Sequence, residues 1–456
     1  MPKDPPKIPD PLLLANTLRF RRDAPAFFVN TLRSSGDSSR FRLGRRLVYL
    51  LFHPDHVERI LSTNRSNYPR AGYDRLEPLL GAGLLSSEGE AWRSQRRAIQ
   101  PAFHPQRFPD MVEDMNAAVT DLCGRLDHGA HSGEIVDIEV EMNRLALGMI
   151  GRALFGYNVS RQAPEVNEDL SYILRYTLSR IGRLWALPAR VSTPARRRYA
   201  ASLVRLNSVV DTLIAQQRNS PTEKNNGRPN LISELLDFRD PKTGAPFDEK
   251  RIRDNVLTFL TAGHETTAKA LTWSLYLMAR HPEQGGRLRQ EAQDLASSDH
   301  LTHDTLRTLD FHGMFIRESL RLFTPVPGLA RQVVDEDVVG EHRLLPDARV
   351  IVSPYATHRH PDFWLDPGRF DPERFKPGTK TYIRRHPYAY FPFGRGPRQC
   401  IGTNFAQLEM KLALAVIARR YTLSLPPGHD ASYVPTETLF TLRPKYGMPV
   451  HVAHAA

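Results

Sequence analysis

The spacing of apolar positions predicts a mainly helical chain with a long helix in its middle. From Pro109 to Leu295, apolar residues recur at intervals of three and four, as on one face of a helix. Within this region we expect an unbroken helix from about Glu249 to Arg280 and a polar surface loop at residues 218–230. A further helix from about Thr305 to Leu322 should end before Pro325, because proline cannot continue a helix.

Short strands are expected toward both ends of the chain. An early hairpin is predicted over Phe41–Gly44 and Arg46–Phe52, followed by a short helix from Pro54 to Leu61. Later strands are expected in Val338–Leu345, in Arg349–Val352 and in a terminal hairpin over Ser432–Val452. No repeat or linker divides the sequence. We therefore expect one mainly α domain with small β-sheets over residues 1–456, in which the proline-rich residues 1–15 are flexible.

Composition places the chain among ordinary globular proteins. Of its 456 residues, 41% are hydrophobic and 25% are charged. Residues 1–11 are too polar for a signal peptide, and residues 12–22 fall far short of the ~20 apolar residues that span a membrane. The two cysteines suit a reducing compartment, so we expect a cytoplasmic protein without an integral membrane segment.

The net charge of +12 suggests a negatively charged partner without identifying it. Nucleic acid, an anionic membrane surface and an acidic protein are all compatible with such a charge. No nucleic-acid recognition motif accompanies it, so we expect no nucleic acid to bind. We expect the protein to be a monomer.

The most informative residues are the ten from Phe393 to Gly402, which hold one of the two cysteines among glycines. A helix is expected to begin near Phe405, which places Cys400 close to its N-terminus. Free backbone N–H groups and the helix dipole favour a thiolate there, and Arg398 adds a cation. The alternative, that Cys400 is a small buried apolar residue, is the interpretation we prefer for Cys123.

The pattern Phe-x-x-Gly-x-Arg-x-Cys-x-Gly resembles the haem-binding signature of the cytochrome P450 family, with every fixed position present. This resemblance implies that Cys400 is the axial thiolate ligand of haem b. It implies that Phe393, Gly394 and Gly402 also contact the cofactor. The implied fold is the single triangular cytochrome P450 fold, with the haem between the long central helix and the helix of the cysteine loop.

A second unusual segment, residues 258–267, lies inside the long helix. Glycine and consecutive threonines are poor mid-helix residues, and the Thr266 hydroxyl can bond the carbonyl of Ala262 and bend the helix. With Gly263 removing bulk, a groove lined by a hydroxyl and the carboxylate of Glu265 is expected. A distorted surface helix with incidental threonines is the alternative.

The sequence Ala-Gly-x-Glu-Thr resembles the oxygen-activating motif of the same family. By this resemblance Thr266 and Glu265 are catalytic: Thr266 hydrogen-bonds at the oxygen-binding site, Glu265 belongs to the proton relay, and Ala262 borders the haem. Peroxide-using members tend to lack this acid–alcohol pair, so its presence favours the route that uses dioxygen and reductant.

Cationic residues resemble the family's clamp for the haem propionates. Trp92 and Arg96 share one helical face, although a plain basic amphipathic helix has the same pattern. Arg331 and Arg398 match the other usual propionate partners. His358 is a weaker candidate that is equally compatible with capping a turn.

The pair Glu318 and Arg321 stands at i and i+3 on one helix and means little by itself. In the family this pair is buried and joined by an arginine of the following meander, here Arg374. We assign these three residues to fold integrity.

Two further groups of arginines suggest surfaces. Arg93 and Arg97 should face outward and, with Arg395, Arg384 and Arg385, form a positive patch for an acidic ferredoxin or a flavodoxin-type electron donor. Residues 171–199 hold seven arginines and no acid, near the family's mobile lid over the substrate. They form either a solvated face or a site for an anionic group.

The resemblance implies a monooxygenase that inserts one oxygen atom from O2 into a hydrophobic small molecule such as a fatty acid, terpenoid, steroid or polyketide. Its pocket would be lined by parts of residues 73–85, 257–266, 324–329 and 439–440. The alternatives are a reductant-independent isomerase, dehydratase or peroxygenase of the same fold, and a non-enzymatic haem-binding protein.

Overall fold

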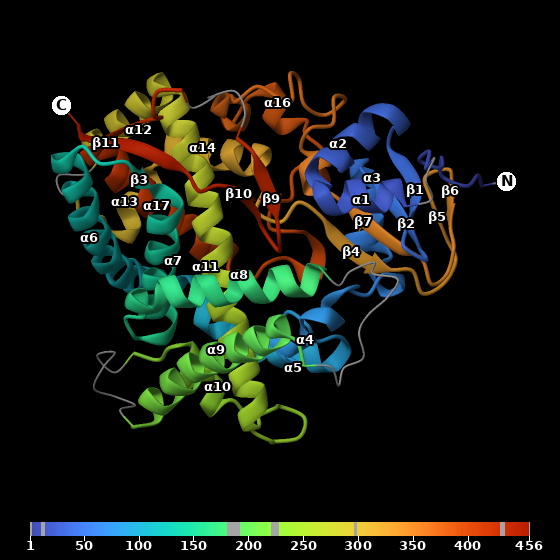
Figure 1. Cartoon of the computed structure of the whole chain (residues 1–456), viewed down its shortest axis with the longest axis horizontal. Coiled ribbons are helices and arrows are strands. Elements are labelled where there is room, and N and C mark those ends of the chain that lie inside the picture. The colour runs from blue at the N-terminus through green and yellow to red at the C-terminus, as the bar shows by residue number, and fades with distance from the viewer. Residues whose placement is uncertain are drawn as a thin grey trace.

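A large helical part and a smaller part rich in strands make up the computed structural model (Figure 1). The structure describes residues 2–10, 14–179, 192–219, 228–295, 299–428 and 434–455. The mainly helical class with small sheets, predicted from the sequence, is confirmed.

The central element is α11 (Glu249–Arg280), whose bounds agree with the predicted helix. The Asp248 side chain caps its start by accepting from the N–H of Arg251, and the helix ends at Arg280, two residues before Pro282. Four long helices pack against it or against its neighbours: α6 (Phe108–Ser132), α7 (Ile138–Phe155), α14 (Asp310–Leu322) and α17 (Thr403–Arg420).

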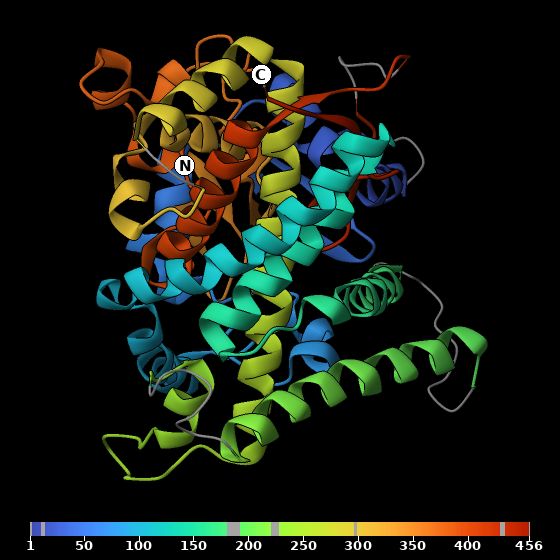
Figure 2. The ribbon, with the colours of Figure 1, turned by 90° about the vertical axis from the view of Figure 1, so that its left-hand side faces the viewer.

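The remaining helices surround this centre. They include α4 (Glu77–Leu80), α5 (Gly89–Ile99), α8 (Ala163–Ser179), α9 (Pro194–Asn219), α10 (Leu231–Asp237), α12 (Pro282–Leu295) and α13 (His303–Thr308). In Figure 2 the long α9 crosses one end of α11, well away from the cysteine-loop helix α17. One helix was expected over Thr305–Leu322, but the structure has two, α13 and α14. They are separated at the buried Leu309, because its ψ of 80° is not helical.

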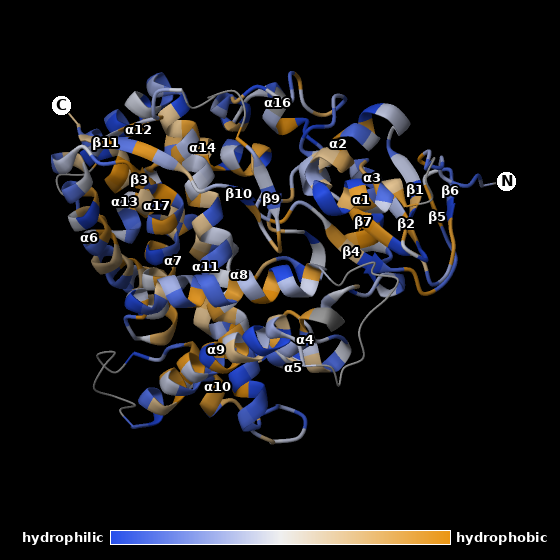
Figure 3. Ribbon diagram, viewed as in Figure 1, coloured by the Kyte–Doolittle hydropathy of each residue, from blue (hydrophilic) through white to orange (hydrophobic). Residues whose placement is uncertain are grey.

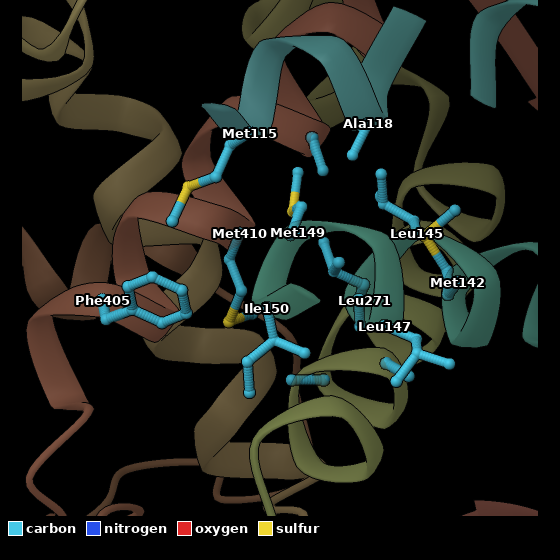
Figure 4. Close-up of a cluster of buried hydrophobic side chains, with 14 of the residues drawn as sticks. Met115, Ala118, Met142, Leu145, Leu147, Met149, Ile150, Leu271, Phe405 and Met410 are labelled. Carbon is cyan, nitrogen blue, oxygen red and sulfur yellow. The ribbon is translucent and has the colours of Figure 1, made fainter. Parts of the chain in front are cut away.

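The main core lies where α6, α7, α11 and α17 meet. Figure 4 shows Met115 of α6, Ile150 of α7, Leu271 of α11 and Met410 of α17 converging, and all four are almost fully buried. Figure 3 shows the same helices with apolar stripes interrupted by polar ones, as the spacing in the sequence predicted.

The principal sheet has the strand order β1 (Ser38–Leu43), β2 (Arg46–Leu51), β7 (Arg349–Val352) and β4 (Leu329–Gln332). The predicted β1–β2 hairpin is confirmed, β2 and β7 run parallel, and β4 is antiparallel to β7. Both faces are covered: Val48 and Leu50 pack with α2 (Ala24–Ser35), whereas Tyr49 and Leu51 pack with α3 (Pro54–Glu58) and the π-turn after it. The short α1 (Ala15–Arg22) precedes α2.

Residues 2–10 run along this part of the fold and do not behave as the free extension expected from their prolines. Lys3 exchanges backbone hydrogen bonds with Glu341 and Arg343, while Ile8 is buried and bonds the carbonyl of Arg40. These contacts hold the chain start against β1 and the hairpin of β5 (Asp337–Val339) and β6 (His342–Leu344).

The C-terminal strands differ from the single hairpin expected over Ser432–Val452. Only β9 (Thr436–Thr438) and β10 (Leu442–Pro444) form a hairpin. The last strand, β11 (Pro449–His454), pairs with β8 (Tyr421–Ser424) and β3 (Val136–Asp137) instead. The β9–β10 hairpin thereby lies beside α11, where it bears on the site described below (Figure 1).

A buried ion pair holds the segment before the cysteine loop. Arg321 and Glu318 are both fully buried and meet at 2.7 Å, and the Arg374 side chain lies 3.4 Å from the same carboxylate. Arg321 also donates to the carbonyls of three residues of the meander (His358, Pro367 and Arg369). The predicted partnership with Arg374 is confirmed. The short α15 (Pro354–Thr357) and α16 (Lys380–Ile383) flank this region.

Candidate active site

The cysteine loop is closed by its own backbone. The N–H of Cys400 donates to the carbonyl of Phe393 at 2.9 Å, and Gly394, with φ of +69°, makes the turn between them. The Thr403 hydroxyl donates to the Cys400 carbonyl and starts α17. His358 accepts a hydrogen bond from the N–H of Phe391 at 2.9 Å and so supports the start of the loop. This contact agrees with the alternative in which His358 caps a turn.

The Cys400 side chain is exposed to an internal cavity and is otherwise enclosed by protein. Burial raises the pKa of its thiol, while the N–H of Gly402 and the charges of Arg96 and Arg70 oppose that rise. The helix terminus and cations therefore act in the direction expected from the sequence, but in the protein alone burial outweighs them. Coordination to a metal ion deprotonates a thiol outright.

Cations gather at one end of the same cavity, which is lined by all four predicted residues, Trp92, Arg96, Arg331 and Arg398. Arg398 lies over the Trp92 ring at 4.1 Å and pairs with Glu88, yet its Nη1 is buried without a partner.

The nearby Arg331 is 7% exposed, and its one described hydrogen bond goes to the neighbouring carbonyl of Ala330. Burial lowers the pKa of Arg331 to about 10. A buried cation with so few anions around it indicates a site for a negatively charged ligand.

Arg70 is a residue of the cavity that the sequence did not reveal. It lines the cavity, donates to the carbonyl of Leu85, and carries a buried Nε without a partner. It stands in no recognisable motif, and more than 250 positions separate it from Arg331, with which it forms an isolated bridge between backbones. Only the folded chain shows that the two belong together.

The central helix forms the opposite wall. Ala262 and Thr266 line the cavity, and the Thr266 hydroxyl donates to the Ala262 carbonyl at 2.8 Å, as predicted. The helix remains continuous through this turn. Gly263 also lines the cavity, and its missing side chain admits Ile150 of α7, because a Cβ there would lie 2.1 Å from Cδ1 of Ile150.

Glu265 lies beside the cavity and not in it. Among the described residues, Thr266 lines the main cavity, while Glu265 borders a small apolar space next to it. Ala262 and Phe440 border both spaces. The Glu265 carboxylate accepts from the Thr441 hydroxyl at 2.7 Å and is 6% exposed, and burial raises its pKa. The hydroxyl and the carboxylate expected to share one groove are therefore in adjoining spaces.

The rest of the cavity wall is mostly apolar, and all four segments expected from the sequence contribute to it, together with residues of α7 and α17 that were not expected. The four segments contribute Leu84, Leu85, Phe259, Val326, Leu329 and Phe440, among others. Phe103 closes the wall beside α17 and contacts the rings of Phe259 and Phe405. The cavity thus combines one thiol, one cationic end and an apolar lining.

The predicted surface arginines are only partly where they were expected. Arg93, Arg97 and Arg384 are exposed, and Arg395 is partly exposed and stacks on the Tyr388 ring. Arg385 is only partly exposed, because its guanidinium packs against the rings of Trp364 and Phe375, at 4.3 and 4.6 Å from their centres.

Of the seven arginines in 171–199, Arg180, Arg183 and Arg190 lie outside the described residues. Arg175 pairs with Glu437 and Arg198 pairs with Glu168, in exposed contacts typical of a solvated face.

The comparison with known proteins agrees with this geometry. The family described as Cytochrome P450 matches residues 5–449. Cyclooctatin synthase from Streptomyces melanosporofaciens is 32% identical over 423 residues, which cover 92% of this chain and 90% of that protein. Pentalenene oxygenase from Streptomyces avermitilis is 30% identical over 421 residues, covering 91% and 90%.

Among solved structures, the haem domain of cytochrome P450DA superposes with a TM-score of 0.88 at 27% identity, covering 100% of this chain and 98% of that one. The chain therefore belongs to the cytochrome P450 family and has its fold. It is a haem-dependent oxidoreductase, a monooxygenase that uses O2 and receives electrons from a redox partner.

The residues present fit a haem. A sulfur donor faces the cavity from the cysteine loop, and the walls on either side are apolar enough to hold a flat macrocycle. The arginines at one end carry buried N–H groups without partners, as two propionate carboxylates require.

Within the described part of the chain, none of the helices combines the length and the apolar character that crossing a membrane requires.

Proposed function

We propose that this enzyme hydroxylates or epoxidises a hydrophobic small molecule, with terpenoids the favoured class. The observation that carries the proposal is the single cavity in which Cys400, Thr266 and the cationic end meet an apolar wall. Relatives named for the terpenoids cyclooctatin and pentalenene favour that class over fatty acids, steroids and polyketides, and suggest a role in secondary metabolism.

In this proposal Cys400 would bind the iron of haem b through its sulfur, with Phe393, Gly394 and Gly402 shaping the loop around it. Arg96, Arg331, Arg398 and Trp92 would hold the propionates, and Arg70 would join them because it lines the same cavity. Ala262 would contact the cofactor from α11. Haem, when bound, supplies the redox chemistry of dioxygen activation.

The residues of α11 handle protons and water. The Thr266 hydroxyl lines the cavity opposite the cysteine loop and can accept a hydrogen bond while it donates to Ala262. Glu265 precedes Thr266 by one position and borders the adjoining space, and in this proposal it exchanges protons with this hydroxyl through water. The apolar wall excludes other water and orients the substrate.

We further propose an acidic ferredoxin or a flavodoxin-type protein as the electron donor. Arg97 and Arg384 are exposed, and Arg93 is exposed beside Glu90, so the docking surface has fewer free cations than the sequence suggested. Reversing the charge of Arg93 and Arg97 should slow electron transfer and flatten its salt dependence. Unchanged rates and salt dependence would contradict this surface.

The enzyme would act as a cytoplasmic monomer formed by one domain. Both described cysteines are free, which suits a reducing compartment. Gel filtration with light scattering tests the monomeric state.

Turnover under isotopically heavy dioxygen tests the function. A candidate terpenoid is first selected by the spectral shift that it causes on binding, and the enzyme is then supplied with a surrogate redox partner and reductant. One heavy oxygen atom should appear in the product. A product that forms without reductant would favour the isomerase or dehydratase alternative, and one that forms only with peroxide would favour a peroxygenase.

A further inference from the structure

A buried cluster of charges lies directly beside Glu265. Lys269 follows one helical turn later on α11 and is 1% exposed. Its Nζ donates to Oε1 of Glu139 at 2.7 Å and to Oδ1 of Asn143 at 3.2 Å, both on the adjacent α7. Arg443 of β10 approaches the same Glu139 oxygen at 3.3 Å. The cluster therefore joins α7, α11 and the β9–β10 hairpin, which meet in the middle of the molecule (Figure 1).

Packing alone does not explain a lysine at this position. Ala268, Ala270 and Leu271 show that α11 meets its neighbours here through apolar side chains. Removing an ammonium group and a carboxylate from water costs several kcal/mol, and a well-packed apolar pair is commonly as stable or more so. The charge of Lys269 thus has a cost that the fold does not require.

The cluster acts on Glu265 from three elements. Lys269 of its own helix and Arg443 of β10 favour the carboxylate form, whereas Glu139 of α7 disfavours it. The sides formed by α8 and by residues 76–85 are apolar, with Leu170 and Leu174 among them. His264, the preceding residue, is uncharged near neutral pH because burial lowers its pKa to about 4.

Charge counting links the four groups. Lys269 and Arg443 bring two positive charges, and Glu139 brings one negative charge. A fourth charge, the carboxylate of Glu265, would neutralise the cluster. Burial pushes the Glu265 pKa up, and Lys269 is the largest influence in the opposite direction.

We propose that Lys269 is a positioning residue for oxygen activation: its ammonium group, held in place by Glu139, fixes the charge state of Glu265. This inference rests on the proposed role of Glu265 in proton delivery. Without the lysine, Glu265 stays protonated over a wider pH range, so the pH dependence of its proton transfer during turnover changes. Without Glu139, the lysine acts on Glu265 unopposed.

The test is an infrared titration of the haem-loaded protein. The carboxylic-acid band of Glu265 is assigned by its loss in Glu265→Gln. In Lys269→Met the titration midpoint of this band should move to higher pH, by about one pH unit or more. In Glu139→Gln it should move to lower pH. Lys411→Met is the matched control, since Lys411 is a partly buried lysine on α17 that donates to the Leu306 carbonyl.

The opposite signs make the test decisive. A midpoint that is unchanged in Lys269→Met, or that moves in the same direction in both variants, would overturn the proposal. If Lys269→Met does not fold, the downward shift in Glu139→Gln carries the test and its absence overturns the proposal.

A second measurement separates this inference from the proposed function. The share of electrons lost as hydrogen peroxide is followed against pH, and its profile should move with the band in Lys269→Met. If Glu265→Gln leaves product formation unchanged, the proposed role of Glu265 fails, whereas the band shift still reports whether Lys269 controls Glu265.

Discussion

The Thr267 hydroxyl donates a hydrogen bond to the carboxyl group of Glu409 at 3.0 Å, across the contact between α11 and α17. All of α11 is described, and its other five serine and threonine hydroxyls (Thr258, Thr261, Thr266, Thr272 and Ser274) donate to the carbonyl four residues earlier. Thr267 and Ser274 also reach other helices: Ser274 donates to the Ser319 hydroxyl of α14 at 2.9 Å, whereas Thr267 is bonded to a carboxyl group. Glu409 is 1% exposed, and its second oxygen has no partner.

Stability should therefore depend on pH through Glu409. Burial raises its pKa from 4.5 to about 8 in the folded protein. Between these values the unfolded chain loses the proton and the folded chain keeps it, so the free energy of unfolding falls as pH rises. This loss is at most about 1.4 kcal/mol per pH unit.

Glu409→Gln removes the titrating group and keeps an acceptor for Thr267. Relative to the wild type, the variant should gain stability progressively from pH 6 to pH 8. Chemical denaturation of the haem-loaded proteins at both pH values measures the difference. An equal difference at both would show that Glu409 does not titrate in this range.

Breaking the buried pair of Glu318 and Arg321 should be costly. Arg321→Met leaves the Glu318 carboxylate buried with only the more distant Arg374, and loses the bonds to three meander carbonyls. We expect a loss of about 3–5 kcal/mol in the free energy of unfolding. Arg343→Met is the control, because its pair with Glu336 is exposed to solvent and should contribute little to stability. Similar losses in both variants would refute the role assigned to burial.

The cysteine loop should not tolerate a side chain at Gly396. This residue has φ of +72°, and a Cβ would lie 2.2 Å from the carbonyl oxygen of Leu61. Gly396→Ala should displace the loop and reduce the haem content of the purified protein. Gly378→Ala shares the positive φ of +81° but has open space around it. Gly378→Ala should lose about 1–2 kcal/mol of stability and keep its haem. Equal haem loss in the two variants would show that the close contact between Gly396 and Leu61 is not needed for haem binding.

Local motifs made much of the fold and site predictable from the sequence. The bounds of α11 followed from its apolar spacing, and Arg374 was placed beside Glu318 because a family motif joins them. The turn between Phe393 and Cys400 likewise depends on neighbouring glycines.

Contacts between distant segments were not predictable. Glu139 and Lys269 are 130 positions apart, and neither stands in a motif. The sequence does not show that Ile150 packs against Gly263 in the wall of the cavity. Arg385 was assigned to the surface because nothing local shows the rings against which it packs. In each case the deciding partner comes from another element of the fold.

The central claim is that Cys400 binds the haem iron as a thiolate, and the carbon-monoxide difference spectrum of the reduced protein tests it most directly. The wild type should show the red-shifted Soret band of a thiolate-ligated haem. Cys123→Ser should keep this band, because Cys123 is buried in α6 within the core. Cys400→Ser should lose it. A red-shifted band that persists in Cys400→Ser would contradict the account.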